Sequence, residues 1–182
     1  IQGSWNYQSM SGPGFAFALR PLVRQGEDES EADVAVIGRH LQRFNSHPYL
    51  SGVVLGAVAR MEAEHVDPKV IHAFKGAVQG SLGSLGDTLF WGAWRPATLL
   101  MALAVAALGA PPWIPVLLFL VIYNVGHVAV RLWSLRIGLE EGRNVAARLA
   151  GAGLPRVAER VFAAGAVLLG MVVGLLLVGR LA

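Results

Sequence analysis

The stretch "ATLLMALAVAALGAPPWIPVLLFLVIYNVGHVAV", residues 97–130, contains no Asp, Glu, Lys or Arg. It is too long for one membrane crossing, because a transmembrane helix needs only about 20 apolar residues. The turn sequence "GAPPW" at 109–113 divides it and predicts a hydrophobic hairpin. Its second half, Ile114–Val130, is a good spanning helix, whereas the first half is short and is either tilted or part of a re-entrant hairpin with residues 76–95.

The composition of the whole chain agrees with a membrane protein. Hydrophobic residues make up 54% of the 182 residues and charged residues 15%, with a mean hydropathy of +0.53. Soluble domains carry about 25% charged residues. The uncharged segment Val161–Gly179 is long enough to span a bilayer by itself. We therefore predict an all-α, polytopic integral membrane protein.

The N-terminal part predicts shorter helices. A period of three to four residues indicates an amphipathic helix whose apolar stripe consists of Val34, Ile37, Leu41 and Phe44. "NSHP" ends it, and a second helix follows at about Tyr49–Glu64, with a face of small residues. Asp67 and Pro68 are typical of a helix start and open a third helix. Small residues along that helix favour close helix approach or a broken, re-entrant helix; they are Gly76, Gly80, Gly83 and Gly86.

These segments predict an organisation in four parts relative to the bilayer. Residues 1–96 form an amphipathic and re-entrant helical half, and 97–130 form a hydrophobic transmembrane pair. Residues 131–160 form a connection with six arginines against three glutamates, and 161–182 form a C-terminal transmembrane helix. The positive-inside rule places the arginine-rich connection in the cytoplasm, together with the N-terminal half.

Several function classes are disfavoured by composition. The net charge is only +3 and is scattered, so nucleic acid is not an expected partner. Cysteine is absent, and the five histidines have no metal-ligand spacing, so we expect no metal and no cofactor. The serines have no nucleophile motif and no acid–base partners, so we expect no catalytic residue in this chain.

The segment "GSLGSLGDTLFWGAWRP", residues 80–96, carries the most notable polar residues. Asp87, Trp91 and Arg95 recur every four residues and share one face of a continuous helix. Ionisable groups at membrane depth usually face a bundle interior or a water-filled path. The alternative is that Asp87 caps a helix start and Arg95 lies at the membrane interface. A nucleotide-binding loop is disfavoured because the lysine of that motif is missing.

Two histidines are also candidates. His47, beside Asn45, could bind a hydroxylated ligand, although capping of a helix end is the simpler interpretation. His127 could relay protons within a span, or it could be interfacial because it lies close to Arg131.

Four segments together resemble a known family. They are "SWNYQSMSGPGFAFALRPL" (4–22), "RHLQRFNSHPYLSGVVLGAVARME" (39–62), the segment 80–96 and "YNVGHVAVRLWSLRIGLEEG" (123–142). In this order they are similar to the IID membrane subunit of mannose/fructose/sorbose-type sugar phosphotransferase systems. The resemblance runs from about Gln2 to Gly142.

The resemblance implies partners and a location. A IID subunit works with a IIC membrane subunit to carry a mannose-type hexose inward, while cytosolic IIA and IIB units supply the phosphate. It implies the inner (cytoplasmic) membrane, a homo-oligomer of IIC–IID units and no enzyme activity of the chain on its own. The matching positions that it assigns to the substrate path or the subunit interface are Asn45, His47, Pro48, Gly86, Asp87, Trp91, Arg95 and Pro96.

Two other functions remain as alternatives. One is a non-transporting membrane scaffold or regulatory member of the same fold. The other is a proton-coupled secondary carrier that uses Asp87 and His127. The long C-terminal part usual in the family does not follow Ala182, and we expect a shortened member.

Overall fold

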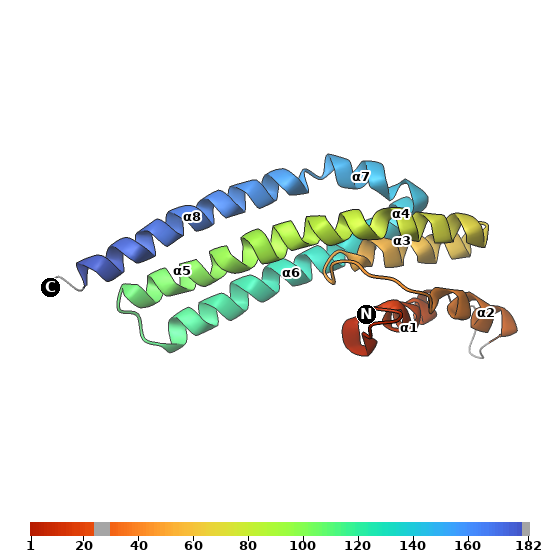
Figure 1. Cartoon of the computed structure of the whole chain (residues 1–182), viewed down its shortest axis with the longest axis horizontal. Helices are drawn as coiled ribbons and strands as arrows, with labels where there is room; N and C mark the ends of the chain where they lie inside the picture. Colours follow the sequence, from red (N-terminus) through yellow and green to blue (C-terminus); the bar gives the residue numbers. More distant parts are fainter. Residues whose placement is uncertain (24–29, 180–182) are drawn as a thin grey trace. The chain divides into compact units, whose positions relative to one another are not determined.

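The computed structural model describes residues 1–23 and 30–179, and these residues are helical with no β-strand among them (Figure 1). Isolated bridges join Asn6 to Met10 and Met10 to Phe44. The all-helical prediction is thus confirmed. The elements are η1 (Gln2–Ser4), α1 (Gly12–Val23), α2 (Glu31–His40), α3 (Ser51–Ala63), α4 (Pro68–Gly86), η2 (Asp87–Trp94), α5 (Arg95–Ala107), α6 (Trp113–Glu141), η3 (Gly142–Asn144), α7 (Val145–Gly151) and α8 (Leu154–Val178).

The chain packs as two compact units. Unit 1 comprises Ile1–Ser84 and Val130–Ala152, and unit 2 comprises Leu85–Ala129 and Gly153–Ala182. The chain passes from one unit to the other within α4, within α6 and before α8. The four predicted ranges describe positions relative to a bilayer, which packing does not test, so those ranges remain predictions.

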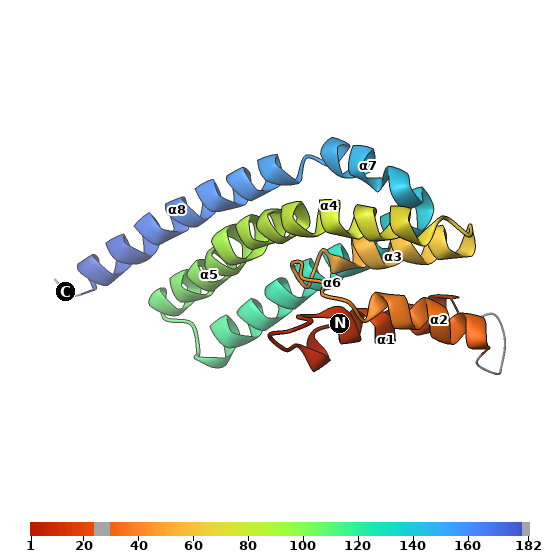
Figure 2. The ribbon, with the colours of Figure 1, turned by 45° about the vertical axis from the view of Figure 1, so that its right-hand side comes forward.

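Unit 1 has a conventional buried core. Helices α1 and α2 lie side by side, and α1 also contacts α3 (Figures 1 and 2). Large apolar side chains fill the interior. Those with no exposed surface include Phe15, Leu19, Phe44, Leu50, Val53, Val54, Val58 and Met61. Burial of each such side chain contributes about 1.5–3 kcal/mol relative to exposure, so unit 1 has its own source of stability.

Glycines allow α3 to approach the C-terminal end of α6 in unit 1. A Cβ atom at Gly56 would lie 2.6 Å from the Leu139 nitrogen, and one at Gly138 would lie 2.9 Å from the Ala57 nitrogen. Only glycine fits such backbone contacts. By contrast, a Cβ atom at Gly80 would meet no atom within 4 Å among the described residues. The close approach therefore involves the small-residue face of α3 and not the first glycines of α4.

The helix starts were predicted more accurately than the buried face of α2. Asp67 caps α4 by accepting a 2.8 Å hydrogen bond from the Lys69 backbone. Helix α2 ends at His40, and the predicted apolar stripe is wrong at Val34 and Leu41, which are 55% and 49% exposed, whereas Phe44 beyond the helix is buried as predicted. The residues that α2 buries are Asp33 and His40. The polar contacts of His40, described below, orient the helix in this way.

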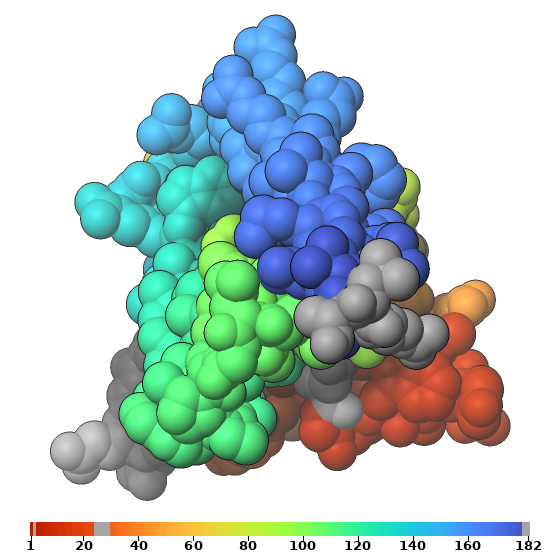
Figure 3. Space-filling model, turned by 90° about the vertical axis from the view of Figure 1, so that its left-hand side faces the viewer, coloured from red at the N-terminus to blue at the C-terminus, as the bar shows by residue number. Residues whose placement is uncertain are grey.

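Unit 2 is built from helices that expose apolar side chains. Helix α8 packs along α5, and in the space-filling view the blue residues of α8 lie against the green residues of α5 (Figure 3). Large apolar side chains of α6 and α8 face outward. Those at least half exposed include Trp113, Val116, Leu117, Val121, Val125, Phe162, Val167, Leu176 and Val178. A surface of this kind is stable against lipid and not against water.

The described residues contain three helical runs that are long and apolar enough to cross a membrane: Pro68–Ala107, Trp113–Gly151 and Leu154–Val178. The predicted spanning helix Ile114–Val130 lies inside α6, which begins at Trp113, the last residue of "GAPPW", and continues to Glu141. The predicted helix Val161–Gly179 lies largely inside α8. The short apolar half of the hairpin is the end of the 40-residue run that starts at Pro68.

Candidate functional site

The glycine-rich segment contains a π-helix. Residues Asp87–Trp94 of η2 follow α4 without a break and lead directly into α5. At its end the Arg95 backbone N–H donates to the Phe90 carbonyl, five residues earlier. π-Helical segments are rare and occur frequently at functional sites. The helix is therefore continuous, and its hydrogen-bond pattern changes from α to π at Asp87. Asp87 is also the acid that the sequence analysis selected as a candidate.

The polar and aromatic candidates of this segment lie on its exposed side. Asp87, Trp91 and Arg95 are exposed, whereas Leu89, Phe90 and Ala93 are buried on the other side. The Arg95 guanidinium carbon lies 5.7 Å from the centre of the Trp91 ring, within the range of a cation–π contact. The π-helix thus presents an acid, an aromatic face and a base on one apolar helical run.

Two neighbours of this stripe were not singled out by the sequence. Trp94 packs its indole ring against Gly126 of α6, where a side chain would collide with the ring. The indole Nε1 is buried and has no acceptor among the described residues. Thr98 closes the end of the π-helix, since its hydroxyl donates to the carbonyls of Trp94 at 2.9 Å and Arg95 at 3.0 Å.

The "NSHP" loop lies in unit 1, against α4. The Asn45 backbone donates to the Gln79 side chain at 3.1 Å, and a Cβ atom at Gly83 would lie 4.0 Å from the His47 nitrogen. His47 is 2% exposed, and its carbonyl accepts from the Leu50 and Ser51 backbones at 3.0 and 2.9 Å. These bonds satisfy N–H groups at the start of α3. They are the contacts expected of the capping alternative, and a ligand role for Asn45 or His47 remains a prediction.

The candidates therefore fall into two groups. Asn45, His47, Pro48, Gly80 and Gly83 lie in unit 1, where the loop and α4 meet. The remaining candidates lie in unit 2, on or next to the π-helix; they are Gly86, Asp87, Trp91, Arg95 and Pro96.

The third polar candidate, His127, lies in unit 2 on α6. Its Nε2 is 2.9 Å from Asn124 Oδ1, and Asn124 in turn donates to the Leu120 carbonyl at 2.6 Å. The imidazole also packs on Tyr123, with 5.4 Å between the ring centres. A proton-relay role of His127 remains a prediction.

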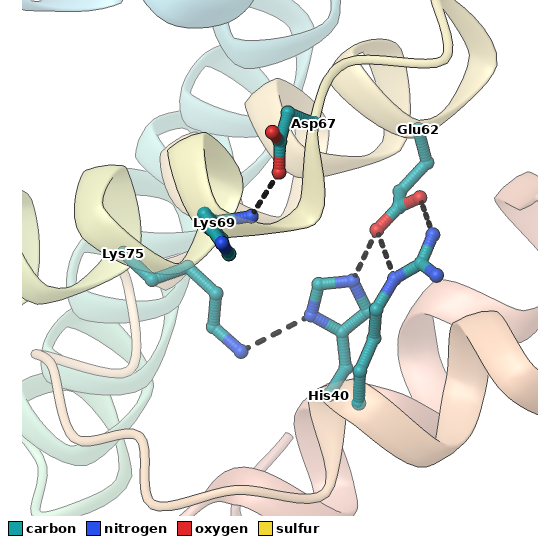
Figure 4. Close-up of polar contacts among 6 residues, drawn as sticks. His40, Glu62, Asp67, Lys69 and Lys75 are labelled. Atoms are coloured by element: carbon teal, nitrogen blue, oxygen red, sulfur yellow. Dashed lines mark hydrogen bonds and ion pairs between the residues drawn. The ribbon is translucent and has the colours of Figure 1, made fainter.

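A buried polar cluster in unit 1 was missed by sequence reasoning (Figure 4). It consists of Arg39 and His40 from α2, Glu62 from α3 and Lys75 from α4. Glu62 lies at the centre: His40 Nε2 is 2.7 Å from one carboxylate oxygen, and Arg39 Nε donates to the same oxygen at 3.0 Å. A second guanidinium nitrogen of Arg39 pairs with the other oxygen. Lys75 Nζ lies 3.2 Å from His40 Nδ1.

The donors and acceptors fix the state of this cluster. An ammonium only donates, so His40 Nδ1 must accept from Lys75 and Nε2 must carry the proton donated to Glu62. Burial lowers the pKa of His40 from 6.5 to about 4, against the opposing effect of Glu62. Burial alone would raise the pKa of Glu62, but the hydrogen bonds from Arg39 and His40 bring it below its usual value. Near neutral pH a neutral imidazole thus joins a carboxylate to an ammonium.

No local motif could have revealed the cluster. Its members come from three successive helices, α2, α3 and α4, and helical spacing relates only residues within one helix. The one available signal is an acid, Glu62, near the end of a helix with an otherwise apolar, small-residue face. No group of three His, Cys, Asp or Glu side chains in the described ranges is arranged to hold a metal ion.

Comparison with known proteins identifies the family. The sequence model described as "PTS system mannose/fructose/sorbose family IID component" matches residues 1–179. The chain belongs to this family. The predicted resemblance is confirmed, and it extends beyond Gly142 to nearly the whole chain.

Individual relatives carry related names. The chain is 30% identical over 179 residues to the mannose-specific EIID component of Escherichia coli K12, covering 95% of this chain and 61% of that protein. It is 27% identical to the sorbose-specific EIID component of Lacticaseibacillus casei, over 94% of this chain and 62% of that protein. It is 30% identical to the fructose permease IID component of Bacillus subtilis, over 95% of this chain and 62% of that protein.

A solved structure has the same fold. It is a cryo-EM structure of the mannose transporter ManYZ in complex with microcin E492, with a TM-score of 0.71 and 28% sequence identity. The match covers 93% of this chain and 63% of that one. This IID-family chain therefore spans about three fifths of the length of the relatives that it matches.

Proposed function

We propose that the chain is the IID membrane subunit of a sugar phosphotransferase permease. The observation that carries the proposal is the continuous family match over residues 1–179, supported by the fold shared with a mannose transporter. The three apolar helical runs supply the membrane location that such a subunit requires. We further propose a mannose-type hexose as the transported sugar, because relatives named for mannose, sorbose and fructose all match.

The chain acts in this proposal as part of an assembly and not as an enzyme on its own. A IIC membrane subunit pairs with it, and cytosolic IIA and IIB units phosphorylate the sugar. The exposed apolar surface of α6 and α8 offers area for a partner helix as well as for lipid. IIC–IID units assemble further into an oligomer in the inner membrane, with residues 1–96 and 131–160 on the cytoplasmic side.

We assign the π-helix of unit 2 to the substrate path or to the seam with IIC. The support is physical: Asp87, Trp91 and Arg95 are exposed, and Asp87 and Arg95 are the only charged residues from Leu85 to Ala107. Charged groups within a membrane segment are retained where they face water, substrate or a polar partner. An acid and a base beside an aromatic face can bind hydroxyl groups or a polar surface of another subunit.

The decisive experiment replaces Asp87. The Asp87→Asn variant is expressed with its IIC, IIA and IIB partners, and phosphoenolpyruvate-dependent uptake of labelled mannose is measured. We expect uptake to fall by about tenfold or more, because loss of one charged hydrogen-bond acceptor costs roughly 1.5–3 kcal/mol. Glu159→Gln is the matched control, since Glu159 is also an exposed acid of unit 2. It should transport normally.

Two results would contradict the proposal at different levels. Unchanged uptake by Asp87→Asn would remove any essential role for Asp87 while leaving the subunit assignment intact. Uptake by this chain without IIC, or failure to co-purify with IIC, would overturn the subunit assignment and favour the carrier or scaffold alternative.

A further inference from the structure

Unit 1 contains a cavity of about 270 Å³ with a basic lining. Its cationic side chains are Arg39 from α2 and Lys69 and Lys75 from α4. The imidazoles of His40 and His72 complete the polar wall. No carboxylate is among the described residues that line it. The cavity thus concentrates positive charge from two helices in one small space.

Lys75 is the strongest indication of a ligand. The residue is only 7% exposed, and its ammonium contacts the neutral imidazole of His40. On another side the ammonium lies 4.5 Å from the centre of the Phe15 ring and 5.6 Å from that of Phe44. No carboxylate of the described residues lies within ion-pair distance of it. An ammonium has three hydrogen-bond donors, and a buried cation without an anion is costly.

The nearby acids are already engaged. Glu62 is bound by Arg39 and His40 on the far side of the imidazole (Figure 4). Asp67 accepts the Lys69 backbone N–H at the start of α4. The positive end of the α4 dipole adds to the potential at this end of the helix. Among the described residues, no carboxylate therefore forms an ion pair with the ammonium of Lys69 or Lys75.

We propose that this cavity binds a phosphate-type oxyanion, either inorganic phosphate or the phosphate group of a small phosphorylated metabolite. A tetrahedral oxyanion accepts several donors at once, which suits the two ammonium groups and the His72 imidazole that line this cavity. The volume exceeds that of a water-sized ion site and leaves room for an organic group on the phosphate. The proposal concerns unit 1 and does not depend on the transport function.

The test measures binding to the purified chain in detergent micelles. Isothermal titration with inorganic phosphate is done at constant ionic strength against chloride. We expect saturable binding of phosphate and none of chloride. Mannose 6-phosphate and glycerophosphoglycerol, the headgroup of an anionic lipid, are titrated in parallel. Tighter binding of the sugar phosphate assigns the organic group to a metabolite, and tighter binding of the headgroup assigns it to lipid; either supports the oxyanion site.

Variants locate the binding. Lys69→Gln removes an exposed cation of the lining without disturbing the core, and we expect phosphate affinity to fall about tenfold. Lys75→Met keeps the side-chain volume and should abolish binding; circular dichroism checks that it folds. Arg148→Gln is the matched control, because Arg148 is an exposed cation of unit 1 outside the lining. Its affinity should equal that of the unmodified chain. Absence of phosphate binding, or equal losses in Lys69→Gln and Arg148→Gln, overturns the proposal.

Discussion

Units 1 and 2 of this chain differ in how far their large apolar side chains are buried. Unit 1 turns Phe15, Phe44 and Met61 inward until none of their surface is exposed. Unit 2 leaves side chains such as Trp113 and Val178 about two-thirds exposed. Only 6% of the most apolar window of the run Trp113–Gly151 is buried within the chain. One unit is thus stable through its own core, whereas the other needs lipid or a partner to cover it.

The same contrast holds for charged groups. In unit 1 the carboxylate of Glu62 is almost fully buried and is satisfied by two basic side chains. In unit 2 Asp87 is exposed, and Arg95 is the one other charged residue from Leu85 to Ala107. A buried and paired charge contributes to folding only while its partners remain, whereas an exposed charge on a membrane helix is available for other interactions. Stability and function should therefore respond differently to the two acids.

The largest expected effect comes from Glu62. Glu62→Gln leaves Arg39 without its anion and takes a charged acceptor from the buried His40. Breaking a buried pair costs about 3–5 kcal/mol. Because Arg39 is partly exposed, we expect the free energy of unfolding to fall by about 3 kcal/mol. Urea unfolding in detergent, followed by circular dichroism, measures the change. Asp87→Asn is the matched acid-to-amide control and should change stability by less than about 0.5 kcal/mol. Equal losses in the two variants would contradict the distinction between the units.

The second effect is a pH dependence of unit 1. The pKa of His40 is lowered from 6.5 to about 4 by burial, so between these values the unfolded chain binds a proton that the folded chain does not. Stability is full above pH 6.5 and falls as the pH drops toward 4, by about 3 kcal/mol in total. The lowered pKa of Glu62 acts in the same direction at still lower pH. Thermal unfolding from pH 7.5 to 4.5 tests this, and His40→Gln should flatten the curve between pH 6.5 and 4.5.

An unchanged slope in His40→Gln would show that other groups of unit 1 or the unfolded chain cause the pH dependence. The groups that face the His40 imidazole are Arg39, Glu62 and Lys75, and each remains in that variant.

The membrane helices could be predicted from the sequence, but the polar cluster could not. Uncharged runs of about 20 residues have one stable environment. The predicted segments Ile114–Val130 and Val161–Gly179 accordingly lie in or largely in the observed α6 and α8. Local chemistry also identified the start of α4 at Asp67 and Pro68. The His40–Glu62 contact joins residues 22 positions apart on different helices, and nothing local specifies which helices will pack together.

The prediction of the buried face of α2 was partly wrong for a related reason. A hydrophobic period ranks helix faces by burial of apolar groups alone. Here hydrogen bonds of His40 and Arg39 to Glu62 decide which face of α2 turns inward, and Val34 is left exposed. The π-helix could not be predicted from the sequence either, although it begins at Asp87, directly after the glycine run.

The smallest effect compares one glycine from each unit. In unit 1 a methyl group at Gly138 would press on the backbone of α3, including the Ala57 nitrogen at 2.9 Å, and backbone cannot move aside without shifting the helix. In unit 2 a methyl group at Gly165 of α8 would touch the Ala97 Cβ at 3.5 Å, an ordinary contact. We expect Gly138→Ala to lower stability by about 1–3 kcal/mol. Gly165→Ala should be neutral or stabilising by up to about 1 kcal/mol, because alanine favours the helix. Thermal unfolding in detergent distinguishes them, and a greater loss in Gly165→Ala would mean that the α5–α8 contact of unit 2 is packed as rigidly as the core of unit 1.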